Sequence, residues 1–105
     1  MRKARMPEIF NDLDKIATDL FSSLKEYEKE DRLVPAKIQR AVALLESNLS
    51  KIHDSQKSRI QVFINAANDM MAKGLDKDGS WDLYAKLSGV VSGLHQMAKD
   101  TKWEE

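Results

Sequence analysis

The chain has 105 residues, of which 42% are hydrophobic, 32% charged and 7% aromatic. This length supports one domain with a single modest core. The 17 basic and 17 acidic residues cancel, so no overall field draws the protein toward nucleic acid or an anionic membrane. Cysteine is absent, which excludes disulfides, thiolate nucleophiles and Cys-based metal sites. With no apolar stretch long enough for a membrane span or a signal-peptide core, we expect one cytoplasmic or nuclear domain over residues 1–105, with residues 1–6 flexible.

Two amphipathic segments occupy the first half of the chain. In the first, apolar residues recur every three or four positions, as one face of a helix requires. They are Phe10, Leu13, Ala17, Leu20, Leu24 and Tyr27, with Ile9, Ile16 and Phe21 widening the stripe. The charge-rich run 25–32 then predicts a frayed helix end and a solvated loop. A second helix begins at Pro35, a residue suited to a first turn. Its apolar positions are Ile38, Val42, Leu45, Leu49 and Ile52, with Ala41 and Leu44 beside them.

Two further helices are predicted in the second half. The third begins after Asp54 or Ser55, either of which can cap free backbone N–H groups, and ends at Gly74. Its apolar side comprises Ile60, Phe63, Ile64, Ala67, Met70 and Met71. Residues 76–79 predict a turn, and Ser80 is the predicted cap of the fourth helix. That helix carries Leu83, Tyr84, Leu87, Val91, Leu94, Met97 and Ala98. The helical period and the short connections predict an all-α fold, an up-down antiparallel bundle of four helices.

Residue types that perform catalysis or bind metals are few and scattered. Neither His53 nor His95 lies four residues from another metal ligand, so a structural role is expected for both. The segment that starts at Asp76 lacks the spacing of a calcium loop, because its twelfth residue is Leu87 rather than glutamate. Acidic residues two apart in a helix point in different directions and do not converge on a substrate. We therefore predict a protein that is not an enzyme and uses no cofactor or metal.

The fourth predicted helix carries a stripe of small residues, Ala85, Gly89 and Gly93. A glycine inside a helix costs up to about 1 kcal/mol relative to alanine, so two on one face indicate a gain from close approach of another helix. That helix belongs either to the same bundle or to a partner. Met71 and Trp103 extend the predicted partner surface, because thioethers and aromatic rings suit interfaces. The leading prediction is a non-catalytic protein–protein interaction or adaptor module that binds a protein partner or a second copy.

The second predicted helix is the basic part of the chain. Residues 32–53 carry four basic side chains and one acidic one. The basic residues are Arg32, Lys37, Arg40 and Lys51. Packing between two acidic elements explains this pattern through weak surface ion pairs. The alternative is a small RNA-contacting patch, although no aromatic stacking platform accompanies it. A third possibility is an inhibitor or immunity-type protein that masks a site on another protein.

Several short motifs follow one another between residues 35 and 103. They are Lys37-Ile38-Gln39-Arg40, the helix start Asp54-Ser55, the apolar residues Ile60, Ile64 and Ala67, the pair Trp81-Asp82, and Trp103. In this order the segment resembles the helical domain shared by the steroid receptor RNA activator protein and the C-terminal region of the large COPII outer-coat subunit. Ser88 stands where that family tends to carry a histidine. The resemblance implies a non-catalytic interaction domain of a larger assembly, and it adds some weight to the RNA-contacting alternative.

Overall fold

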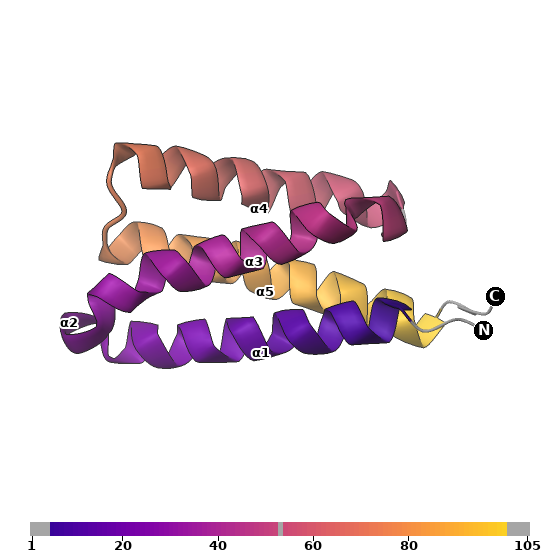
Figure 1. Cartoon of the computed structure of the whole chain (residues 1–105), viewed down its shortest axis with the longest axis horizontal. Helices are drawn as coiled ribbons and strands as arrows, with labels where there is room; N and C mark the ends of the chain where they lie inside the picture. Colours follow the sequence, from indigo (N-terminus) through magenta and orange to yellow (C-terminus); the bar gives the residue numbers. More distant parts are fainter. Residues whose placement is uncertain (1–4, 53, 101–105) are drawn as a thin grey trace.

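The computed structural model describes residues 5–52 and 54–100, which form an all-α bundle (Figure 1). Its four long helices are α1 (Arg5–Lys25), α3 (Val34–Asn48), α4 (Asp54–Lys73) and α5 (Lys77–Asp100). Neighbouring helices run in opposite directions, so the predicted antiparallel four-helix bundle is confirmed. Residues 1–4 of the segment expected to be flexible lie outside the described residues, whereas Arg5 and Met6 belong to α1.

The bundle is elongated, with extents of 45 × 22 × 18 Å, and α1 packs between α3 and α5. The contacts between α1 and α5 are the most extensive, while α4 packs mainly on α5 and less on α3. The core consists of the predicted apolar stripes, and each large side chain within it stabilises the fold by roughly 1.5–3 kcal/mol. Its fully buried members include Leu13, Leu20, Leu24, Ile38, Leu45, Ile60, Phe63, Leu83, Leu87 and Leu94. Within residues 5–52 and 54–100, no helix combines the length and apolarity that crossing a bilayer requires.

The charge-rich segment after α1 is helical, so the prediction of a solvated loop there was wrong. It forms a one-turn helix α2 (Tyr27–Glu30) and a 3-10 turn η1 (Asp31–Leu33). The Glu26 carbonyl accepts bonds from the backbone N–H groups of Lys29 and Glu30, both at 2.9 Å. The buried Ser23 hydroxyl donates to Glu30 Oε1 at 2.8 Å, which ties the turn to the end of α1. A side-chain partner in α1 therefore holds this segment in place.

The connection between α4 and α5 is shorter than predicted. As expected, Gly74 ends α4, with a φ of 104° that side-chain-bearing residues rarely adopt. The predicted turn at residues 76–79 and the predicted cap at Ser80 were wrong, because α5 already begins at Lys77. Asp76 Oδ1 accepts a 2.7 Å bond from the backbone N–H of Gly79, and this is the geometry of a helix N-cap. Ser80 is buried instead, and its hydroxyl donates to the Asp76 carbonyl at 2.7 Å.

Two apolar stripes differ slightly from the prediction. Helix α3 ends at Asn48, and Leu49 begins a 3-10 turn η2 (Leu49–Lys51) before the buried, extended Ile52. Of the two adjacent valines in α5, Val90 is buried, whereas Val91, which was predicted to belong to the apolar stripe, is half-buried. The two valines are adjacent, and Val90 continues the spacing set by the other buried residues of α5 better than its neighbour does.

Candidate functional site

The small-residue face of α5 packs against α4 of the same chain. Gly93 is buried, and a Cβ added there would lie 3.0 Å from Arg59 Nη1 and closer still to the Gln56 carboxamide. A Cβ at the half-buried Gly89 would meet the Arg59 side chain at 4.0 Å, while Ala85 is exposed. The close approach that the glycines allow is thus made within the bundle. Gly93 in particular offers no surface to a partner while α4 covers it.

The remaining residues of the predicted partner surface do not join this face. Met71 is half-buried against the core at the end of α4, whereas Gln56 and Arg59, which cover Gly93, lie in its first turns. Met71 and Gly93 are therefore at opposite ends of the α4–α5 pair. Trp103 lies outside the described residues, as does His53. The proposed set is not brought together as one surface by the part of the chain that the structure describes.

The basic residues of the RNA-contacting alternative are likewise divided. Lys37 Nζ lies 3.1 Å from Asp19 Oδ1 and donates to the buried Ser23 hydroxyl at 2.5 Å. Its side chain is only 14% exposed, so the charge holds α3 against α1 and is not presented to solvent. Arg32 and Arg40 are exposed, and the side chain of Lys51 lies outside what the structure describes.

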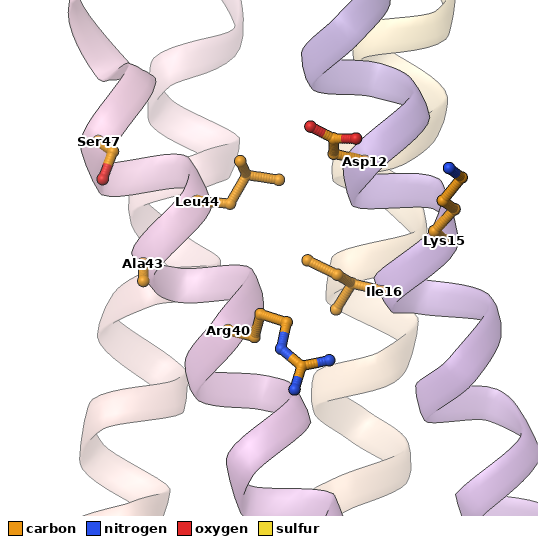
Figure 2. A pocket seen from close by; sticks show the side chains of 7 residues that line it. All are labelled: Asp12, Lys15, Ile16, Arg40, Ala43, Leu44 and Ser47. Carbon is orange, nitrogen blue, oxygen red and sulfur yellow. The ribbon is translucent and has the colours of Figure 1, made fainter.

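A surface groove that the sequence analysis missed runs between α1 and α3 (Figure 2). It has a volume of about 500 Å³ and opens broadly to solvent. Helix α1 and helix α3 supply its two walls. The lining residues are Asp12, Lys15, Ile16, Arg40, Ala43, Leu44 and Ser47.

The groove combines an apolar floor with charged rims. Ile16 and Leu44 are half-buried and face each other across it (Figure 2). Asp12, Lys15 and Arg40 are exposed, and none of them has an ion-pair or hydrogen-bond partner among residues 5–52 and 54–100. Such a surface can bind apolar side chains and pair with charges beside them. In the sequence, the one sign of this groove was that Ile16 and Leu44 stand beside the centre of their apolar stripes and not within it.

An aromatic cluster covers the opposite flank of α1, where it meets α5. The Phe21 ring lies 5.9 Å from the Trp81 ring and 5.4 Å from the Tyr84 ring, centroid to centroid. Lys25 Nζ stands 5.3 Å from the centre of the Phe21 ring, within the range of a cation–π contact. These are contact distances, so the rings pack on one another. Phe21 remains 37% exposed, although its place in the sequence indicated a widened core stripe.

A second hollow lies further along the same flank. Its volume is about 410 Å³. It is lined by Phe10, Val91, Ser92, His95 and Gln96. His95 is exposed, and its ring lies 4.9 Å from that of Phe10. This tilted ring contact joins α1 to α5.

No chemical activity is indicated by a metal-binding cluster among the described residues or by a known relative. Over the described ranges no three histidine or acidic side chains are grouped so that they could hold a metal ion. The chain matches no family model, no curated protein and no solved structure. The resemblance to the steroid receptor RNA activator and COPII coat domains therefore stays a prediction.

Proposed function

We propose that the protein is a non-catalytic helical interaction module that binds a protein partner through the groove between α1 and α3. The observation that carries this proposal is the pairing of an apolar floor, Ile16 and Leu44, with three exposed charges that lack partners in the described chain. Apolar contact surrounded by a polar rim is the usual composition of a protein interface. The groove residues come from two helices that the core holds in a fixed relation, so the surface is formed before binding.

The RNA-contacting alternative has less support. An RNA-binding patch needs several cations free to replace the counterions of phosphates. Lys37 is already paired with Asp19, which leaves Arg32 and Arg40 as the exposed cations of the proposed patch whose side chains are described. No specific observation favours this function over protein binding.

The proposal is tested by photo-crosslinking in cells of the source organism. A photoreactive amino acid replaces Ala43, an exposed residue of the groove, in the full chain. The matched control places it at Val62, which is 52% exposed on α4, outside the groove. We expect a discrete product of higher mass from position 43 that is absent from position 62. The same products from both positions, or no product from position 43, would contradict the proposal.

A further inference from the structure

The walls of the groove determine which secondary structure can fill it. Both walls are helices, whose interior backbone N–H and C=O groups are already hydrogen-bonded within each helix. The groove therefore offers no free strand edge to which an extended peptide could add. A segment that buries its backbone here must satisfy its own hydrogen bonds, as a helix does.

The length of the groove fits two helical turns. From Arg40 to Ser47 the α3 wall rises about 10 Å, at about 1.5 Å per residue. A bound helix of two turns presents apolar side chains at positions i, i+3 or i+4, and i+7 on one face. Ile16 and Leu44 lie between the two rims, where such side chains would contact them (Figure 2).

The charges on the rims determine which charge the bound helix should carry on its flanks. Arg40 stands on the α3 rim and Lys15 on the outer side of the α1 rim, so each rim carries a cation, against the single anion Asp12, whose carboxylate lies on the side of α1 that faces α3 (Figure 2). Figure 2 shows the Arg40 guanidinium extending from α3 toward α1, below Ile16. Burial of the floor would exclude water and strengthen ion pairs to both cations. A helix with basic flanks would face like charges on both sides.

We propose that the groove binds an acidic amphipathic helix of a partner protein, with its apolar stripe on Ile16 and Leu44 and its carboxylates beside Lys15 and Arg40. The inference rests on the proposed function and specifies its partner. Asp12 favours a basic residue at one end of the bound helix, and this sets the direction in which the helix lies.

A displayed library of helical peptides is the probe that tests this inference. The library keeps a helical backbone pattern and randomises both the apolar stripe and its flanks. Selection on the full chain should enrich large aliphatic residues in the stripe and Asp or Glu on the flanks. Selection on the double variant Lys15→Glu, Arg40→Glu should enrich Lys or Arg on the flanks instead. The selected acidic peptide should bind the single variant Arg40→Glu about tenfold more weakly than the unchanged chain.

Three results would overturn the inference. They are flanks without charge preference, the same flanks from both selections, and no peptide retained by the full chain above the bare support, whereas a Val62→Lys chain, whose groove is unchanged, should retain the same peptides as the full chain. A chain that forms a dimer in light scattering, and loses the dimer in the double variant Lys15→Glu, Arg40→Glu, would show that a second copy occupies the groove and would also overturn the inference. Circular dichroism checks that each variant is folded, and because the replaced side chains are exposed we expect unchanged helix content. Crosslinking at position 43 to a partner that is not an acidic helix would overturn this inference and leave the proposed function standing.

Discussion

Replacing Gly89 by alanine should stabilise the protein, although the residue lies on the face that α5 turns toward α4. Gly89 is in the middle of a 24-residue helix, where alanine is favoured over glycine by about 0.8–1 kcal/mol. The new methyl group would meet the Arg59 side chain at 4.0 Å, an ordinary van der Waals distance. The methyl group therefore meets no steric clash that would offset the higher helix propensity of alanine. The free energy of unfolding should rise by nearly 1 kcal/mol. For a domain of this size the melting temperature should rise by about 4 °C.

Urea unfolding followed by circular dichroism measures this difference, and Gly93→Ala provides the matched comparison. At Gly93 the methyl group would displace the Gln56 carboxamide, so part of the same propensity gain is lost. We expect Gly89→Ala to be the more stable of the two variants. If Gly89→Ala lowers the free energy of unfolding, then α4 and α5 pack more closely at this position than the structure describes, and the reasoning is refuted.

Three other substitutions should destabilise the bundle, each for a different reason. Gly74→Ala places a side chain at a φ of 104° and should lower the free energy of unfolding by about 1 kcal/mol in urea denaturation; an unchanged value would contradict the left-handed turn. Asp76→Ala removes the N-cap of α5 and should lower it by about 1 kcal/mol, whereas Asp76→Asn should retain most of the stability in a thermal melt. Lys37→Met keeps the buried stem but removes the bonds to Asp19 and Ser23, so a loss of about 1–2 kcal/mol is expected in urea denaturation; an unchanged free energy of unfolding would contradict these contacts.

The sequence was sufficient to predict the four long helices because their apolar residues repeat with the helical period, whereas the short α2 has no such repeat. It was insufficient at the start of α5, where Asp76 and Ser80 are both residue types that cap helices. Gly79 between them favoured a turn, since glycine is common in turns. The choice depends on the hydrogen bond from the Gly79 N–H to Asp76, a three-dimensional contact. Two caps of equal propensity cannot be ranked without it.

The candidate site was less predictable than the fold, because it depends on how two helices are spaced. Ile16 and Leu44 appear in the sequence as residues beside a core stripe, and only the separation of α1 from α3 leaves them on the floor of a groove. Lys37 similarly appears as a free cation of a basic helix. Its partner Asp19 is 18 positions earlier in the chain and lies on another helix, and no local pattern links the two. The glycines of α5 did predict a close approach, but not which helix makes it.

The extensive packing of α1 on α5 has a consequence for synthesis of the chain on the ribosome. Among the four long helices of the bundle, α1 is synthesised before the others and has its main partner in α5, which is synthesised after them. Until α5 has left the exit tunnel, the apolar stripe of α1 is covered only by α3 and remains available to chaperones or to other nascent chains. Contacts between such distant segments also slow the final folding step relative to a bundle whose neighbours are all adjacent in sequence. A released chain that ends before residue 77 should therefore be an aggregation-prone three-helix species.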